Sequence, residues 1–237
     1  MKPWQDEQLQ LLLAEDNEHQ VFDHIAEIAR RLGFDHCAYG VRPPLPVSRQ
    51  RIVMFNTYPT EWRERYAKQN YLAVDPTVQH GLRSALPVVW SEEFFANARE
   101  FWEEARAFNL RYGWAHPCRD AQGVLGMLTV ARSHEDLSDA EMQETSIKLS
   151  WLAQISHLAM TRILVRKLVP ESNVKLSHQE TAVIRWTADG KSAAEIAKIM
   201  GLSVRTVTFH LTNVTSKLNA ANKTAAAVRA AMLGLLY

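Results

Sequence analysis

The sequence predicts an α+β fold: an α-β-α sandwich on an antiparallel sheet of about five strands, followed by an all-α domain of four helices. Short strand-like runs alternate with amphipathic helices in the first part of the 237 residues, and only helical periodicity follows. The charge changes at the same place. Residues 174–237 carry eight Lys/Arg and three Asp/Glu, a net charge of +5, whereas residues 1–173 have a net charge of −4. We therefore expect an N-terminal domain at 1–165, a linker at 166–174 and a C-terminal domain at 175–237.

The first 33 residues are predicted to be helical, because apolar residues from Val21 to Leu32 recur every three or four positions and Gly33 is suited to end a helix. Strands are expected at 36–41, 51–56 and 87–90, and a hairpin is expected to join 112–119 to 124–132. Helices are expected at 61–69 after an N-cap at Thr60, after Asp75–Pro76, at 92–109, and from Ser138 to near Val165. Helices against such a sheet can enclose a pocket on one face.

Each helix of the C-terminal domain has its own start signal. N-caps are expected at Ser177, Ser192, Ser203 and Asn222. Glu180 and Glu195 follow the first two caps at the spacing of a capping box. Gly190 ends the first helix, and Gly201–Leu202 makes a short turn between the second and the third. Two helices joined by a short glycine-containing turn form a helix-turn-helix.

The third of these helices is predicted to have one buried and one exposed side. The buried stripe is Val204, Val207, Leu211, Val214 and Leu218, and the exposed side carries Arg205, Thr208, Phe209, Thr212, Asn213 and Ser216. In a DNA major groove, Thr methyls and Phe can contact a thymine methyl, Thr hydroxyls and Arg can bond base edges, and Asn can pair with adenine. Candidates for phosphate contacts are Lys191, Ser203, Thr206, His210 and Lys217. The alternative is a small helical domain that binds another protein.

This C-terminal sequence resembles the DNA-binding domain of the LuxR family. The matching positions are Glu180, Trp186, Gly190, 192–196, Ser203, Thr206, Val207, His210, Asn213, Lys217, Leu218, Asn222 and Lys223. The resemblance implies that Thr208, Phe209 and Thr212 face the bases. It also implies a homodimer on an inverted-repeat operator in double-stranded DNA, control of transcription and, for an activator, contact with RNA polymerase.

The N-terminal domain holds a set of aromatic residues with a few polar groups. Trp62 and Tyr66 are four residues apart on a predicted helix and share a face. The set is completed by Tyr58, Asp75, Trp90, Phe101, Trp102 and Thr129. Trp donates, ionised Asp accepts, and Tyr and Thr do both, so the set suits a neutral ligand with one N–H, two carbonyls and a long apolar part. The alternatives are that Trp62 and Tyr66 are core residues, that Asp75 is only an N-cap, and that Thr129 is an ordinary strand residue.

Residues 56–90 resemble the acyl-homoserine-lactone-binding domain of LuxR-type quorum-sensing receptors, through Trp62, Tyr66, Asp75–Pro76 and Trp90, and Gly113 also matches. The resemblance implies that Trp62 donates to the lactone carbonyl and that Asp75 accepts from the ligand amide. It implies that Tyr58 and Thr129 bond the acyl carbonyl, while Tyr66 and Trp90 form walls. Weaker candidates for the pocket are Ala38, Gly40, Met54, Val78, Leu82, Phe101, Trp102, Leu110 and Met127.

The long helix that begins near Ser138 has more apolar residues than one core-facing stripe needs. We interpret the excess as a homodimer face; the alternative is a helix buried within its own domain. The resulting prediction is a quorum-sensing regulator that binds an N-acyl-homoserine lactone autoinducer and DNA. The alternative is an orphan regulator that responds to a different apolar ligand or acts without one.

Several other classes are disfavoured. No apolar run approaches the ~20 residues of a membrane span, and residues 1–10 lack a signal-peptide pattern, so we expect a cytoplasmic protein with no membrane partner. Cys37 and Cys118 are too few for a disulfide scaffold or a four-thiolate zinc site and are expected to be reduced. The histidines lack the H-E-x-x-H spacing, and there is no G-x-S-x-G sequence. We therefore expect no metal, no cofactor and no enzymatic activity.

Overall fold

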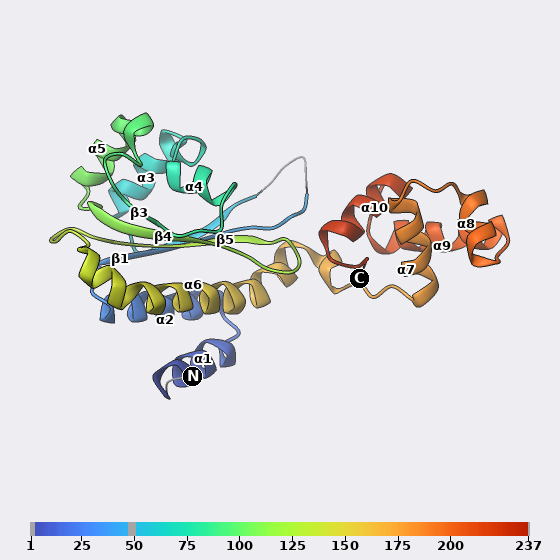
Figure 1. Cartoon of the computed structure of the whole chain (residues 1–237), viewed down its shortest axis with the longest axis horizontal. Helices are drawn as coiled ribbons and strands as arrows, with labels where there is room; N and C mark the ends of the chain where they lie inside the picture. Colours follow the sequence, from blue (N-terminus) through green and yellow to red (C-terminus); the bar gives the residue numbers. More distant parts are fainter. Residues whose placement is uncertain (1–2, 47–50, 237) are drawn as a thin grey trace. The chain divides into compact units, whose positions relative to one another are not determined.

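The computed structural model describes residues 3–46 and 51–236. The chain forms two compact units, and its last passage from the first to the second lies between residues 164 and 165 (Figure 1). The first unit contains a sheet with helices on both faces, and the second is helical. This confirms the predicted fold class. Among the helices of residues 3–46 and 51–236, none combines the length and the apolar character that a membrane span requires.

The sheet has five strands in the order β2-β1-β5-β4-β3, and every neighbouring pair is antiparallel. The strands are β1 (His36–Arg42), β2 (Val53–Asn56), β3 (Val88–Val89), β4 (Tyr112–Arg119) and β5 (Leu125–Arg132). The expected hairpin is the β4–β5 pair, in which Tyr112 lies opposite Arg132. Successive residues of β1 point to opposite faces. Cys37, Tyr39 and Val41 are therefore on one face, and Ala38 and Gly40 are on the other.

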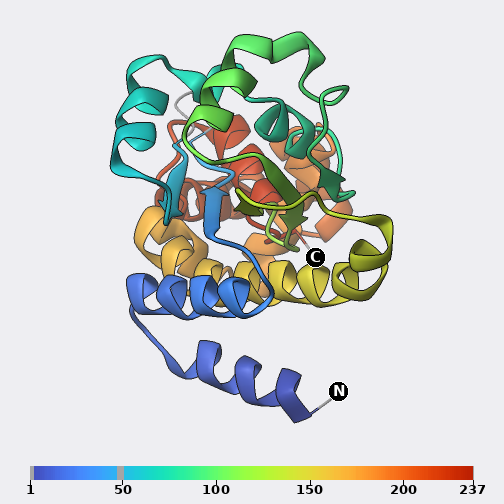
Figure 2. The ribbon, with the colours of Figure 1, turned by 90° about the vertical axis from the view of Figure 1, so that its left-hand side faces the viewer.

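Helices cover both faces of this sheet (Figure 1). One face is covered by α2 (Glu18–Arg31) and α6 (Asp139–Leu168), and the other by α3 (Thr60–Lys68), α4 (Pro76–Gly81) and α5 (Arg99–Ala107). Helix α1 (Pro3–Ala14) lies outside α2, away from the sheet (Figure 2). Under α6, the Tyr39 hydroxyl is 2.9 Å from Nδ1 of His157, and burial lowers the pKa of His157. The sheet face toward α2 and α6 is thus closed by packing.

The region expected to be helical, residues 1–33, holds two helices in its described part, α1 and α2. The helical geometry is interrupted at 15–17, where the Glu15 carboxylate accepts from the N–H groups of Asp16 and Asn17. Asn17 then caps α2 by accepting from the N–H groups of His19 and Gln20. Such local side-chain bonds compete with helix continuation.

Three expectations about helices need correction. Thr60 is not an N-cap, because α3 follows Pro59 and the Thr60 hydroxyl instead accepts from Nη2 of Arg63 at 2.9 Å. The helix expected over 92–109 is confined to Ala96–Ala98, a 3₁₀ helix, and α5, because Ser91 Oγ accepts from the Phe94 N–H in a preceding turn. Helix α6 continues to Leu168, so the segment expected to be a linker begins inside a helix.

The four predicted helices of the second unit are α7 (His178–Ala188), α8 (Ala193–Met200), α9 (Val204–Lys217) and α10 (Lys223–Met232). Both predicted capping boxes are present, at Ser177 with Glu180 and at Ser192 with Glu195. Ser203 caps α9, as expected. Gly201 has φ +64°, a left-handed conformation that glycine adopts freely, and it turns the chain from α8 into α9.

Candidate functional site

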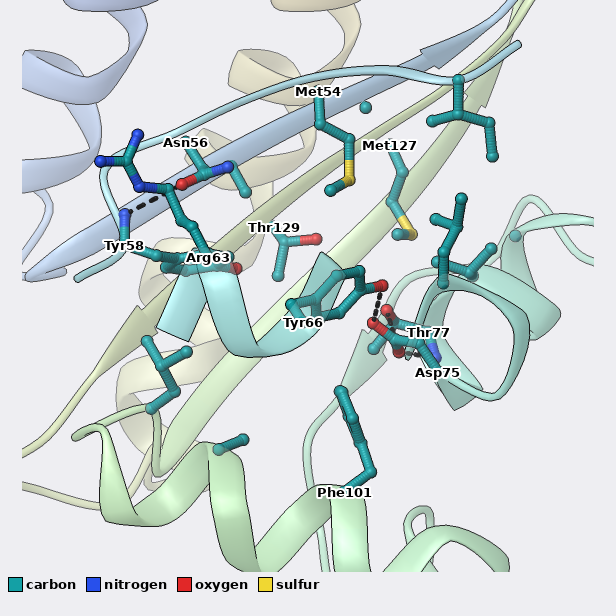
Figure 3. Close-up of a pocket in the computed structure, with 18 of the residues that line it drawn as sticks. Met54, Asn56, Tyr58, Arg63, Tyr66, Asp75, Thr77, Phe101, Met127 and Thr129 are labelled. Carbon is teal, nitrogen blue, oxygen red and sulfur yellow. Dashed lines mark hydrogen bonds between the residues drawn. The ribbon is translucent and has the colours of Figure 1, made fainter. Parts of the chain in front are cut away.

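The first unit contains a cavity of about 310 Å³ between the sheet and helices α3, α4 and α5 (Figure 3). The residues predicted to bind a ligand all line it: Tyr58, Trp62, Tyr66, Asp75, Trp90 and Thr129. The weaker candidates line it as well: Ala38, Gly40, Met54, Val78, Leu82, Phe101, Trp102, Leu110 and Met127. The fold therefore brings into one space residues that are widely separated in the sequence.

The floor of the cavity is the sheet face that carries Ala38 and Gly40. In the β-sheet register, Ala38 lies opposite Thr129 on one side and Asn56 on the other. Gly40 lies opposite Met127 and Met54. Directly opposed residues of antiparallel strands point to the same face, and Figure 3 shows Met54, Met127 and Thr129 along this floor. The two small residues at the centre leave room above the sheet.

Asp75 is both the N-cap of α4 and a polar group on the cavity wall. Its Oδ1 accepts from the N–H and the hydroxyl of Thr77, at 2.8 and 2.7 Å. Its Oδ2 accepts from the Tyr66 hydroxyl at 3.0 Å (Figure 3). Burial raises the pKa of Asp75, although these hydrogen bonds act in the opposite direction. A carboxylate oxygen can accept more than one hydrogen bond, so Oδ2 retains capacity for a donor from a ligand.

Trp62 and Tyr66 belong to an aromatic cluster. They are therefore core residues and, at the same time, part of the cavity wall. The Trp62 ring lies 5.9 Å from the Tyr66 ring and 5.8 Å from the Phe101 ring, measured between centroids. Burial also raises the pKa of the Tyr58 and Tyr66 hydroxyls above their usual value. Both groups therefore stay protonated in the physiological range. Tyr66 donates its hydroxyl hydrogen to Asp75, and Tyr58 can donate its own to a ligand.

Trp90 is held against a glycine of the sheet. A Cβ atom at Gly113 would lie 2.5 Å from the Trp90 ring, so only glycine permits this close approach. Trp90 then packs edge-on against Trp102, and Trp102 stacks on Phe95 at 4.3 Å between centroids. The match at Gly113 seen in the sequence thus has a structural role, which is to place an aromatic wall of the cavity.

Some residues of the cavity were not identified from the sequence, among them Asn56, Arg63, Leu72, Thr77, Phe95 and Gly126. Thr77 could have been found, because an Asp-x-Thr sequence at a helix start places the hydroxyl beside the cap. Asn56 could have been found from the strand pairing with Ala38. Arg63 is an exposed residue on α3, and no periodicity identifies such a position as part of a cavity.

The cavity reaches the protein surface on the side of β2 and α4. Met54 and Leu82 line it, yet these side chains are 45% and 37% exposed. Arg63 also lines it and is exposed. Trp62 and Phe101 also line the cavity and are buried. The arrangement provides an apolar space with the hydroxyls and the carboxylate on its inner wall and an opening at the surface.

In the second unit, the predicted side of α9 is exposed. Arg205, Thr208, Phe209, Thr212 and Ser216 are exposed, and Asn213 is half-buried. Four of the five residues expected to be buried are buried: Val207, Leu211, Val214 and Leu218. Val204 is 49% exposed, so that expectation is wrong. It begins the helix, and helical angle alone does not indicate where along a helix packing starts.

The candidates for phosphate contacts differ in how free their side chains are to reach a phosphate. Ser203 and Thr206 lie at the start of α9 with their hydroxyl oxygens 2.8 Å apart. Lys191 and His210 are half-buried. The Lys217 ammonium is already paired, at 2.7 Å from the Glu180 carboxylate, which favours a structural role for this lysine.

The described ranges contain no cluster of three His, Cys, Asp or Glu side chains placed to hold a metal ion. Cys37 and Cys118 are both free and buried, and burial raises the pKa of each thiol to about 12. Thiols with such pKa values are protonated at neutral pH and are weak nucleophiles.

Two family comparisons match this arrangement of cavity and helices. Residues 17–160 match the autoinducer binding domain, and residues 174–230 match the luxR family of bacterial regulatory proteins. The first match contains the cavity, and the second contains α9. The family consists of transcription regulators, not enzymes.

Individual relatives agree with these matches. The chain is 44% identical to transcriptional activator protein AnoR of Acinetobacter nosocomialis, over 100% of both chains. It is 43% identical to HTH-type quorum-sensing regulator RhlR of Pseudomonas aeruginosa, over 91% of this chain and 89% of RhlR. A crystal structure of Escherichia coli SdiA is 32% identical with a TM-score of 0.86, covering 99% of this chain and 98% of SdiA. SdiA in complex with octanoyl-rac-glycerol gives a TM-score of 0.84 at 32% identity, covering 99% and 96% of the two chains. The chain belongs to the LuxR family of quorum-sensing transcriptional regulators.

Proposed function

We propose that the autoinducer of this regulator is an N-acyl-homoserine lactone and that it binds in the cavity above the sheet. The observation that carries the proposal is the combination of Asp75, Tyr66 and Trp62 on the inner wall of an otherwise apolar space. Asp75 offers an acceptor, and the Trp62 indole N–H and the Tyr58 hydroxyl offer donors, while the Tyr66 hydroxyl donates to Asp75. An acyl-homoserine lactone has the complementary groups: one amide N–H, two carbonyls and an apolar tail.

In this proposal, each polar group of the ligand has at least one partner. Trp62 donates its indole N–H to the lactone carbonyl, and Asp75 accepts the amide N–H through Oδ2. Tyr58 and Thr129 donate to the acyl carbonyl, while Tyr66 and Trp90 enclose the head group. The acyl chain lies along the floor, past Gly40, Met127 and Met54, toward the surface opening. Residues 1–165 would act as the ligand-binding domain.

We also propose that the regulator binds an inverted-repeat operator as a homodimer, through residues 175–237. Ile147 and Leu158 of α6 are 73% and 53% exposed, which supports the interpretation of this helix as part of a dimer face. A dimer places two recognition helices about one DNA turn, or a multiple of it, apart. If the regulator is an activator, its further partner would be RNA polymerase.

The test is calorimetry of the purified full chain with a panel of lactones of short, medium and long acyl chains. The expected result is saturable binding with a preference for one chain length. Mass spectrometry of small molecules that co-purify from a culture fed with the same panel provides independent identification. Absence of binding across the panel would contradict the proposal.

A second candidate is a regulator that responds to a different apolar ligand or acts without one. It is favoured by the SdiA complex with octanoyl-rac-glycerol, since that molecule has an acyl chain but neither a lactone ring nor an amide. The discriminating experiment expresses the full chain without lactone. Soluble protein that binds DNA fully in the absence of lactone would favour this second candidate.

A further inference from the structure

The exposed side of α9 has fewer free hydrogen-bond donors than its sequence suggests. The Thr208 hydroxyl donates to the Val204 carbonyl at 2.9 Å, and the Thr212 hydroxyl donates to the Thr208 carbonyl at 3.0 Å. Each threonine has a single hydroxyl hydrogen. Both hydrogens are therefore used within the helix and are not directed outward.

With both hydrogens used, these two threonines offer a partner their methyl groups, and their hydroxyl oxygens can act only as acceptors. The χ1 angle that turns a hydroxyl back to the preceding turn fixes the methyl group in another staggered position on the same Cβ. Val204, Thr208 and Thr212 are four residues apart, so they form one row along the helix. Phe209, beside this row, is 61% exposed, and Val204 is 49% exposed. The side of α9 expected to face the bases is thus largely apolar.

An apolar surface of this kind has a specific partner in the DNA major groove. The C5 methyl of thymine is the apolar group that a base pair presents there, and the other groups are hydrogen-bond donors and acceptors. The net charge of +5 on residues 174–237 favours a polyanion over an apolar protein surface. The same side also carries Arg205, which is exposed, and Asn213, which is half-buried.

We propose that α9 selects its operator chiefly through thymine methyl groups, which contact the methyls of Thr208 and Thr212 and the ring of Phe209. This inference rests on the proposed binding of DNA by residues 175–237. It assigns the two threonines a role in specificity through their methyl groups and not through their hydroxyls. The hydroxyls serve to fix the orientation of those methyls.

The first experiment replaces thymine with uracil, which removes only the methyl group. The full chain, with and without each lactone of the panel, selects its site from a random duplex library, and affinity is then measured by fluorescence anisotropy. Uracil is introduced at one thymine of each half-site at a time. Loss of one buried methyl is expected to weaken binding about fourfold per position. Undiminished affinity at every uracil position would overturn the inference.

The second experiment separates the methyl from the hydroxyl by two substitutions at one residue. Thr212→Ser keeps the hydroxyl and removes the methyl, and Thr212→Val keeps methyl groups and removes the hydroxyl. The Ser variant is expected to lose affinity for the thymine duplex but to lose nothing further on the uracil duplex, as a double-mutant cycle requires for a direct contact. The Val variant is expected to retain both affinity and discrimination. The reverse pattern would overturn the inference.

A matched control lies on the same helix. Thr215 makes the same kind of bond, from its hydroxyl to the Leu211 carbonyl at 2.7 Å, but it is half-buried and outside the exposed row. Thr215→Ser is expected to bind thymine and uracil duplexes as the wild type does. If the wild-type chain selects no duplex under any condition, the proposed DNA binding fails and the inference fails with it. Tight binding that is indifferent to uracil overturns the inference alone.

Discussion

Asp75 caps α4 and borders the cavity with one carboxylate, which makes its substitution informative. Asparagine keeps an acceptor for the Thr77 N–H, because it is as good an N-cap as aspartate. It replaces the other oxygen with an NH₂ group, which cannot accept a ligand N–H. We expect Asp75→Asn to weaken lactone binding by about 1–3 kcal/mol, roughly 5- to 150-fold, with the fold intact by circular dichroism. The control is Asp23→Asn on the exposed side of α2; equal calorimetric affinity of Asp75→Asn and wild type would remove Asp75 from the site.

The same carboxylate predicts a pH dependence. Burial raises the pKa of Asp75 above the ordinary value of 3.8. Between that value and the raised one, the folded, unliganded protein retains a proton that the unfolded chain has lost. Its stability therefore falls as pH rises through this window. A ligand N–H favours the ionised form, so the ligand-induced increase in melting temperature should grow with pH over the same window. Thermal unfolding of wild type and Asp75→Asn, with and without lactone, measures it, and identical pH profiles would contradict the explanation.

Individual residues were predictable from the sequence where their chemistry was unusual for their position. The spacing of Trp62 and Tyr66 and the Asp75–Pro76 pair drew attention to the cavity, and Trp90 and Thr129 were part of the same candidate set. The resemblance to a known family assigned these residues their expected roles. Arg63 and Phe95 were not predictable. Their presence in the wall depends on how α3 and the turn before α5 pack above the sheet, and this packing leaves no pattern in the local sequence.

At the scale of elements, strand β4 approaches the Trp90 ring so closely at Gly113 that adding a single methyl group there should affect both stability and ligand binding. Gly113→Ala places a Cβ 2.5 Å from the Trp90 ring, so either the ring or the strand must move. We expect destabilisation by roughly 1–3 kcal/mol, together with weaker lactone binding because Trp90 forms a cavity wall. Urea unfolding and calorimetry measure the two effects.

The matched control is Gly40→Ala. Gly40 is another glycine of the same sheet, and it also lines the cavity. There the nearest neighbour of the added Cβ would be Met54 Cγ at 3.8 Å, an ordinary contact. Stability close to that of wild type is therefore expected for Gly40→Ala. If both variants lost equal stability, the cause would be the glycine-to-alanine change in a strand and not the contact with Trp90.

Elements were predicted well where capping residues and periodicity agreed, and less well where they competed with local hydrogen bonds. The helices of the second unit begin at the expected caps, because Ser and Asn side chains there accept from the first free N–H groups. The prediction of one helix over 92–109 was wrong, because the Ser91 side chain accepts from the Phe94 N–H and stabilises a turn there. Thr60 failed as a cap because its hydroxyl accepts from Arg63. Periodicity records which residues are apolar, but it does not record these bonds.

For the whole molecule, the difference in charge between the two parts of the chain was visible in the sequence and predicted two kinds of partner. The same charges predict a salt dependence, because each Lys or Arg at a phosphate releases a counterion on binding. Lys191 and Lys217 were both candidates for such contacts, but the structure distinguishes them. Lys217 is 2.7 Å from the Glu180 carboxylate, and Glu180 is only 4% exposed. A lysine that balances a buried carboxylate has less freedom to meet a phosphate.

We therefore expect opposite effects from the same substitution at the two lysines. Lys191→Gln should reduce the slope of log affinity for DNA against log salt by about one and leave stability unchanged. Lys217→Gln should leave the slope nearly unchanged. It should destabilise the second unit, because the buried Glu180 carboxylate loses its ionic partner. The expected loss is only about 1 kcal/mol, since water partly screens the ion pair on the side of the half-exposed lysine. Fluorescence anisotropy over a range of salt concentrations and urea unfolding of the full chain measure the two quantities. An equal reduction of the slope by both substitutions would show that Lys217 leaves Glu180 to contact a phosphate when DNA binds.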